Sequence, residues 1–82
     1  MQPSEIETLI TAALPDCSAK VTSDDLTHYE AVVVSSAFAG KRRLQRHQLI
    51  YGALGERVGR EIHALSIRAL TPEELAEQGS GA

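Results

Sequence analysis

The sequence is poor in the residues on which small extracellular and membrane proteins depend. Its 82 residues include one cysteine, no tryptophan and only three aromatic side chains. A single cysteine excludes an internal disulfide, which small secreted domains usually need, and no run approaches the roughly 20 apolar residues of a membrane span. The N-terminal residues lack the basic and apolar segments of a signal peptide. We therefore expect a soluble, unprocessed protein of the reducing cytoplasm.

The short length limits the chain to one small domain. A domain of this size buries only about 60% of the surface that its unfolded chain exposes, so its core must be compact and mostly aliphatic. Hydrophobic residues make up 43% of the sequence, which is enough for such a core. We expect one domain over 1–82, with its folded part at about 4–76 and a flexible tail at 77–82.

The charges are divided unevenly along this acidic chain. The formal net charge is −3, but residues 41–68 hold seven basic and two acidic residues. Residues 1–40 hold one basic and six acidic residues, and residues 69–82 add three acidic ones. The simplest interpretation of the basic segment is the solvated face of a helix. A binding surface for an acidic partner is the alternative.

Hydrophobic periodicity predicts a helix and two strands in the N-terminal half. Apolar residues recur at helical spacing over about 4–14, where Ser4 and Glu7 have the spacing of a capping box. Residues 18–24 alternate apolar and polar side chains, and residues 29–35 are rich in β-branched types. A short polar loop separates the two segments. We expect them to form a hairpin.

The C-terminal half predicts a helix, a strand and a last short helix. Helical spacing covers about 42–58 and stops near Gly59, and residues 62–70 are too short and too alternating for another helix. Thr71 and Pro72 then have the types expected at a helix start. The order αββαβα predicts an α+β domain, with a three-stranded sheet and the helices packed on one face.

No sequence motif indicates an enzyme. The glycines match neither nucleotide-binding spacing, and the lone cysteine excludes a four-cysteine zinc or iron–sulfur site within one chain. Cys17 and three histidines would allow a thiol nucleophile with a base, but nothing in the sequence brings them together. We therefore expect a binding protein rather than an enzyme.

The three histidines are the most informative polar residues, although each has a structural interpretation. His63 stands at the start of the predicted third strand, where a histidine commonly bonds a backbone carbonyl. His28 follows the hairpin loop and fits a hydrogen-bonding turn residue. His47 fits the polar face of the second long helix.

Four sequence blocks occur in a fixed order and spacing that changes those interpretations. They are Phe38-x-Gly40-Lys41, Arg46-His47-Gln48-Leu49-Ile50-Tyr51, Ile62-His63-Ala64-Leu65-Ser66-Ile67 and Thr71-Pro72-Glu73-Glu74. With these blocks, the chain resembles the BolA-like family over about residues 4–76. Leu14-Pro15-Asp16-Cys17 and the short hairpin loop are most similar to the bacterial branch typified by YrbA or IbaG. The resemblance implies a class II KH-like fold.

The same resemblance implies an iron–sulfur role with a monothiol glutaredoxin. In such a pair, a two-iron two-sulfur cluster bridges the proteins, and the glutaredoxin cysteine and glutathione supply thiolates. The BolA-like chain supplies the histidine of the Ile-His-Ala block, which is His63 here. Imidazole in place of thiolate makes the cluster less negative and raises its reduction potential. The isolated chain is expected to hold no stable cluster and to be a monomer or weak homodimer.

The resemblance leaves the second ligand open. The family often takes a cysteine or histidine from the hairpin loop, and this loop has no cysteine. His28, at the end of the loop, is the first candidate for the second ligand. Cys17, which precedes the first strand, is the alternative.

A nucleic-acid-binding transcriptional regulator is the rival interpretation of the whole chain. A KH-like fold and bases at a helix N-terminus favour it, because helix amides and basic side chains both attract phosphate. The GxxG clamp of KH domains and most stacking aromatics are missing. The same surface would also suit a glutaredoxin. Its candidate residues are Lys41, Arg42, Arg43, Arg46 and His47.

Overall fold

A computed structural model describes residues 1–80, with side chains for residues 1–77. The order αββαβα and the three-stranded sheet expected from the sequence are confirmed. The elements are α1 (Pro3–Ala13), β1 (Ser18–Thr22), β2 (His28–Val34), the 3-10 helix η1 (Ser36–Phe38), α2 (Arg43–Leu54), the 3-10 helix η2 (Gly55–Arg57), β3 (Ala64–Leu70) and α3 (Pro72–Ser80).

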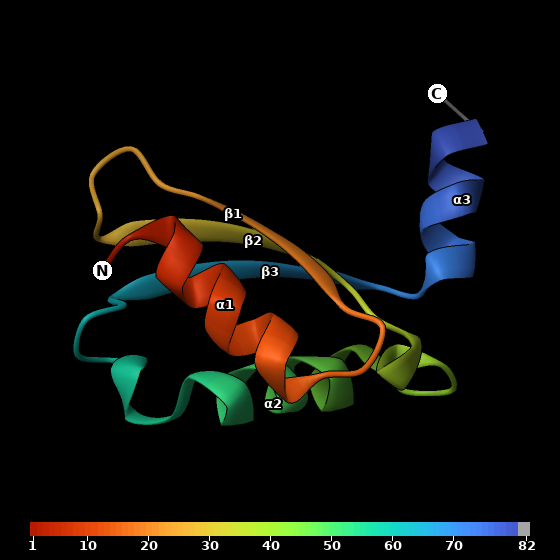
Figure 1. The fold of residues 1–82 in the computed structure, drawn as a ribbon, viewed down its shortest axis with the longest axis horizontal. Helices are drawn as coiled ribbons and strands as arrows, with labels where there is room; N and C mark the ends of the chain where they lie inside the picture. Colours follow the sequence, from red (N-terminus) through yellow and green to blue (C-terminus); the bar gives the residue numbers. More distant parts are fainter. Residues whose placement is uncertain (81–82) are drawn as a thin grey trace.

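The sheet is mixed, with β2 in the middle. β1 and β2 form the expected antiparallel hairpin, and β3 runs parallel to β2 on its other side. Figure 1 shows α1 and α2 together on one side of the sheet, whereas α3 stands apart at the end where β3 finishes. Only Thr71 connects β3 to α3, so the chain has no room to turn back under the sheet. Packing on one face therefore holds for α1 and α2 only.

The core lies between the sheet and these two helices. Alternate β2 side chains, Tyr29, Ala31 and Val33, face the helices and are buried, as the alternation in the sequence predicts. The helices and connections meet them with fully buried apolar side chains. These are Ile6, Ile10, Phe38, Ile50, Leu54 and Ile62.

The N-cap of α1 is Gln2, two residues earlier than the predicted cap at Ser4. The Gln2 amide donates to Glu5 Oε1 at 2.9 Å, so this pair caps the helix in place of Ser4 and Glu7. Pro3 explains the shift, because the first helical position suits proline. Glu7 instead reaches the sheet, where its Oε2 accepts a 2.8 Å hydrogen bond from the Val21 amide.

α2 is shorter than the sequence suggests. It ends at Leu54, and Gly55 follows with φ 61°, a left-handed conformation that glycine adopts readily. The predicted end near Gly59 is therefore wrong by one turn. Gly55 stops the helix first, and residues Gly55–Arg57 continue only as a 3-10 turn.

β3 also begins later than expected, and the reason bears on His63. The Ile62 amide donates to the Arg57 carbonyl at 2.9 Å, and the Gly59 amide donates to the Ile62 carbonyl at 2.8 Å. These bonds hold Ile62 in a tight turn instead of the sheet. His63 therefore lies between that turn and the first residue of β3.

α3 opens with the cap that its sequence predicts. The Thr71 amide donates to Glu74 Oε1 at 2.8 Å, and the Glu74 amide donates to Thr71 Oγ1 at 3.2 Å. The helix then continues to Ser80. Residues 81–82 lie outside the described residues, and the flexibility of the tail at 77–82 stays a prediction.

Candidate functional site

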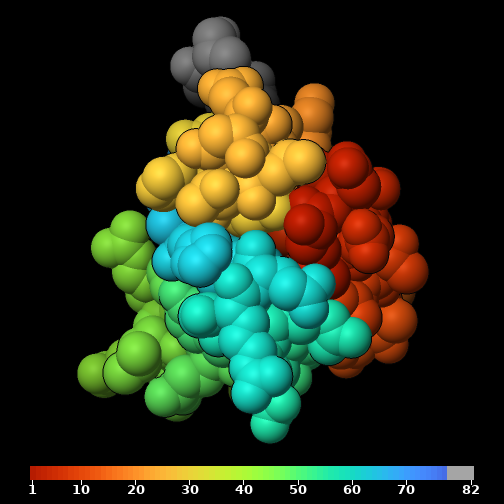
Figure 2. Space-filling view, turned by 90° about the vertical axis from the view of Figure 1, so that its left-hand side faces the viewer, coloured from red at the N-terminus to blue at the C-terminus, as the bar shows by residue number. Residues whose placement is uncertain are grey.

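Two of the candidate histidines lie at the same end of the sheet. The parallel register sets His28, the first residue of β2, opposite Ala64, the first residue of β3, so His63 directly precedes that pair. The Ala64 amide donates to the Thr27 carbonyl at 3.3 Å and closes this end of the ladder. Both histidines are exposed. Figure 2 views this end and shows the β1–β2 loop (orange to yellow) against the segment that leads into β3 (cyan).

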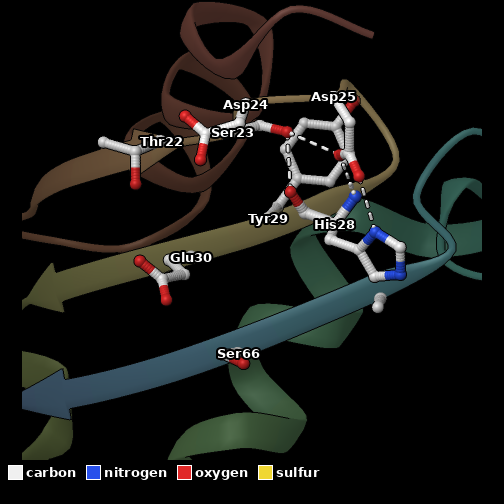
Figure 3. Close-up of a pocket in the computed structure, with 9 residues that line it drawn as sticks. Thr22, Ser23, Asp24, Asp25, His28, Tyr29, Glu30 and Ser66 are labelled. Carbon is white, nitrogen blue, oxygen red and sulfur yellow. Dashed lines mark hydrogen bonds and ion pairs between the residues drawn. The ribbon is translucent and has the colours of Figure 1, made fainter.

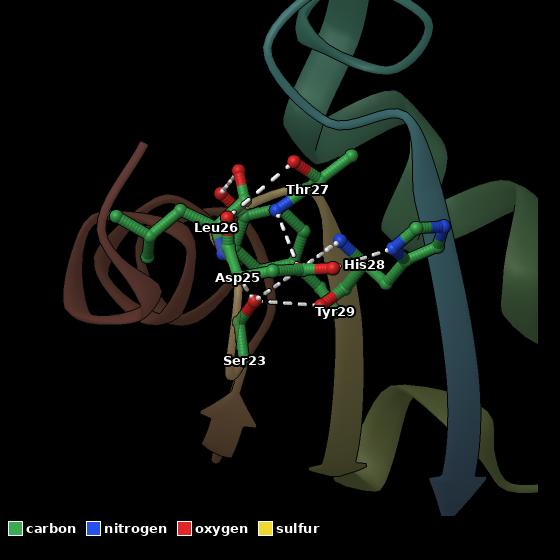
Figure 4. Close-up of polar contacts among 6 residues, drawn as sticks. All are labelled: Ser23, Asp25, Leu26, Thr27, His28 and Tyr29. Carbon is green, nitrogen blue, oxygen red and sulfur yellow. Dashed lines mark hydrogen bonds and ion pairs between the residues drawn. The ribbon is translucent and has the colours of Figure 1, made fainter.

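The β1–β2 loop holds His28 through a network centred on Asp25 (Figure 4). Asp25 Oδ1 accepts hydrogen bonds from the amides of Thr27 and His28, both at 2.9 Å. Ser23 Oγ donates to the His28 carbonyl at 2.6 Å and accepts from the Leu26 amide at 2.9 Å. The loop is therefore ordered by its own polar side chains, although it is exposed.

Asp25 also fixes the ring of His28. Its Oδ2 lies 2.8 Å from His28 Nδ1. The His28 amide, then its ring and the Thr27 amide, hold the pKa of Asp25 well below its ordinary value. An ionised carboxylate only accepts hydrogen bonds, so Nδ1 carries the hydrogen and the neutral ring keeps its lone pair on Nε2. Figure 3 shows this ring reaching over the start of β3.

This arrangement has the donor chemistry of a metal ligand and its supporting shell. A ligating histidine usually donates its other ring nitrogen to a carboxylate or carbonyl, which fixes the ring and its tautomer. The side chain of His28 is 72% exposed, so Nε2 is accessible to a partner. Asp25 is not among the residues predicted from sequence, although an aspartate in a short loop commonly bonds the amides that follow it.

The sheet surface beside His28 is a shallow, polar hollow (Figure 3). Its volume is about 290 Å³, and it is open to solvent. His63 does not line it. The hollow therefore belongs to the surface around one histidine rather than to an enclosed site for both. Its lining residues are Thr22, Ser23, Asp24, Asp25, His28, Tyr29, Glu30, Ala64 and Ser66.

Cys17 is not brought together with the histidines. It precedes Ser18, which pairs with Val34 at the opposite end of β2 from His28. Six residue steps along the strand separate those ends, about 20 Å. Cys17 is half-buried, and burial raises the pKa of its thiol. A ligand set that includes Cys17 and either histidine on the same iron does not fit this sheet.

The basic candidates gather around a second groove, between the start of α2 and the last residues of β3. Lys41, Arg42 and Arg43 are exposed, and His47 is half-buried. Arg42 is not part of the lining. The groove has a volume of about 380 Å³ and is lined by Lys41, Arg43, Arg46, His47, Ile67, Arg68, Ala69, Leu70 and Glu74.

Arg46 is expected to contact phosphate or a partner protein, but its guanidinium is bonded within the fold. Its side chain is only 13% exposed, and its Nη1 donates to Glu74 Oε1 at 2.6 Å and to the Ala69 carbonyl at 3.0 Å. Its Nε donates to the Lys41 carbonyl at 2.9 Å, and its guanidinium lies 5.9 Å from the centre of the Phe38 ring. Arg46 therefore ties α2 to the junction of β3 and α3.

The described part of the chain contains neither a membrane-spanning helix nor a group of side chains that could hold a metal ion by themselves. No helix among residues 1–80 is long and apolar enough to cross a membrane. Within the same residues, no three histidine, cysteine, aspartate or glutamate side chains gather closely enough to hold a metal ion.

Comparisons with known proteins agree with this architecture. A family model described as BolA-like protein matches residues 4–74. The chain is 35% identical to the acid stress protein IbaG of Escherichia coli (strain K12), over 93% of this chain and 90% of that relative. The structure of a bolA protein homologue from Coxiella burnetii is 37% identical, with a TM-score of 0.77, and the match covers 93% of this chain and 97% of the other.

Other relatives match over a shorter segment. The chain spans about half or less of the length of the first curated relatives that it matches. One of them, named DNA-binding transcriptional regulator BolA in Haemophilus influenzae, is 44% identical over 52 residues, which are 63% of this chain and 50% of the relative. The family model and the nearly full-length matches show that the chain belongs to the BolA-like family, in the branch that resembles IbaG.

Proposed function

We propose that this chain is an iron–sulfur adaptor. It forms a heterocomplex with a monothiol glutaredoxin and co-ligates a bridged two-iron two-sulfur cluster, for iron–sulfur trafficking or iron sensing. His63 and His28 are its proposed ligands. The observation that carries the proposal is their shared position at one exposed end of the sheet. Membership of the BolA-like family supports it.

The two histidines have complementary properties for this role. When bound, the cluster would carry thiolates from the glutaredoxin cysteine and glutathione on one iron, and the neutral imidazoles on the other would raise its reduction potential. His28 presents a fixed Nε2, because Asp25 occupies Nδ1. His63 is exposed and precedes the strand, so its ring is free to adjust to the partner.

Reconstitution tests the proposal. We expect a mixture of this chain, a monothiol glutaredoxin, glutathione, ferric iron and sulfide to form a one-to-one protein complex under anaerobic conditions. Its visible circular dichroism should differ from that of the glutaredoxin homodimer, because imidazole replaces thiolate on one iron. A stoichiometric cluster on this chain alone, or a mixture that yields only the glutaredoxin homodimer, would contradict the adaptor role.

Asp25→Asn is expected to weaken cluster binding without unfolding the chain. The asparagine carbonyl still accepts the backbone amides, but its NH₂ group faces His28 Nδ1 and favours the tautomer with hydrogen on Nε2. Losing such a supporting partner typically costs about 10- to 100-fold in metal affinity. Chelator competition on the heterocomplex measures the affinity. Nitrogen chemical shifts of the His28 ring in the apo chain report the tautomer independently.

Asp24→Asn is the matched control for that variant. It removes the same charge from the adjacent position, and no hydrogen bond or ion pair joins Asp24 to another described residue. We expect its cluster affinity and His28 tautomer to equal those of the parent. Equal losses in both variants would mean that loop charge, and not the Asp25–His28 contact, controls binding.

Nucleic-acid binding is the second candidate function. The basic groove beside α2 favours it, as does the DNA-binding name of the Haemophilus influenzae relative. Binding to an oligonucleotide through Lys41, Arg42 and Arg43 should weaken steeply with salt, and each lost phosphate contact should flatten the slope by about one unit. Arg46 adds little to this surface, because its guanidinium is occupied inside the fold.

A further inference from the structure

Each outer edge of the three-stranded sheet receives one side-chain hydrogen bond from a helix. Unpaired backbone groups at a sheet edge attract another strand, so proteins usually cover them. On the outer edge of β1, Glu7 Oε2 of α1 accepts the Val21 amide at 2.8 Å. On the outer edge of β3, the Ala69 carbonyl accepts from Arg46 of α2 at 3.0 Å, and the middle residue of the strand, Ile67, has no such contact among the described residues.

The ladder determines which backbone groups of β3 point outward. The Ala64 amide points toward β2, where it donates to the Thr27 carbonyl. The backbone amides and carbonyls of the alternate residues Leu65, Ile67 and Ala69 therefore point away from β2, toward the outer edge. The Arg46 guanidinium confirms this direction, because it reaches the Ala69 carbonyl from outside. Among the described residues, none hydrogen bonds the Ile67 amide or carbonyl.

This free edge lies in the basic groove beside α2. Ile67 and Ala69 form part of the groove's lining, beside Lys41, Arg43 and Arg68. These three bases have no ion-pair partner among the described residues. The acid in the lining, Glu74, is already paired with Arg46. The groove therefore combines backbone groups that are free to pair with another strand and basic side chains whose positive charge is not neutralised by an ion pair.

We propose that the groove docks an extended acidic segment of a partner protein, which adds to the sheet as a strand beside β3. Backbone bonds to Ile67, whose amide and carbonyl have no partner among the described residues, supply affinity, and the surrounding bases select acidic side chains. A second copy of this chain is a poorer occupant, because the same bases would face one another. Nucleic acid is also poorer, because the groove lining contains no phenylalanine, tyrosine or tryptophan for base stacking.

This surface is separate from the histidine end. The groove begins at Ile67, three residues along β3 from Ala64, which is about 10 Å. An acidic segment bound there leaves His28 and His63 exposed. The inference goes beyond the proposed cluster role and needs no cluster, so its test uses the apo chain.

A peptide titration followed by nuclear magnetic resonance tests the inference. The probe is an acetylated and amidated heptapeptide of alternating glutamate and threonine, titrated into the ¹⁵N-labelled chain. We expect shifts of the Ile67, Ala69, Lys41 and Arg43 amides and slower hydrogen exchange at the Ile67 amide. A control peptide of the same charge, N-methylated at alternate residues, should bind at least about tenfold more weakly, since it cannot form the ladder.

Two charge-reversed variants complete the test. Lys41→Glu with Arg43→Glu should weaken binding of the acidic peptide at least about tenfold. The matched control, Lys20→Glu with Arg60→Glu, changes exposed bases away from the groove and should bind as the parent does. Equal binding of the N-methylated peptide, self-association through the same amides, or groove shifts with an oligothymidine strand but not with the peptide would each overturn the proposal.

Discussion

Replacing His63 with alanine is expected to remove the cluster from the heterocomplex and to leave the apo fold almost unchanged. The side chain is exposed and precedes β3, and no hydrogen bond joins it to another described residue. Its loss should therefore change the free energy of unfolding by less than about 0.5 kcal/mol. Loss of a ligand should instead lower cluster affinity by more than the roughly 100-fold cost of losing a supporting group. Visible circular dichroism and denaturant unfolding separate the two effects.

Three further variants define the ligand set. His28→Ala should behave like His63→Ala, whereas His47→Ala and Cys17→Ser should keep the parent cluster spectrum. His47 lines the basic groove, and Cys17 lies at the far end of the sheet. If the heterocomplexes of His63→Ala and His28→Ala both keep the parent spectrum, the proposed ligands are wrong. If Cys17→Ser alone loses it, the ligand comes from the other end of the sheet.

Arg46→Ala is expected to lower the free energy of unfolding by about 2–4 kcal/mol, more than the loss of any exposed base of the groove. The substitution leaves the Ala69 and Lys41 carbonyls and the Glu74 carboxylate without their guanidinium donor. Arg43→Ala, on the exposed side of the same helix, should change stability by less than about 0.5 kcal/mol. Denaturant unfolding of both variants makes the comparison. Equal values would show that Arg46 does not tie α2 to α3.

The same contact predicts a dependence of stability on pH. The Arg46 guanidinium, and then the Thr71 amide, hold the pKa of Glu74 below its ordinary value of 4.5. The stabilising contribution of Glu74 is therefore present above pH 4.5 and is lost as pH falls through the lower folded-state pKa. Arg46→Ala should flatten this acidic limb of the stability curve, because the main cause of the pKa shift is removed.

Local sequence patterns were sufficient for the elements of the fold. The period of two along a strand puts Tyr29, Ala31 and Val33 on one face of β2, and Thr71 with Pro72 predicts the start of α3. Each of these features depends on residues a few positions apart. The predicted end of α2 is wrong because three glycines, Gly52, Gly55 and Gly59, lie in or just after the predicted helix, and only the backbone identifies Gly55 as the one that ends it.

The candidate site is harder to predict from the sequence, because its contacts join residues that only the folded chain brings together. The basic run suggested that Arg46 faces a partner, but its acceptors lie 23 and 28 positions away at Ala69 and Glu74. The role of Asp25 depends on the conformation of the hairpin loop, in which its two oxygens divide between backbone amides and the His28 ring. The shared location of His28 and His63 required the parallel pairing of β2 with β3.

Pulsed electron paramagnetic resonance of the reduced heterocomplex tests the ligand assignment most directly. This chain would be labelled with ¹⁵N in its histidines, and the glutaredoxin and glutathione would be left unlabelled. Ligation by both histidines predicts strong coupling of the cluster to two ¹⁵N nuclei. One of these two couplings should disappear in His63→Ala and in His28→Ala, wherever the variant retains a cluster. A reduced cluster in the heterocomplex with no ¹⁵N coupling from this chain would contradict the proposed ligation.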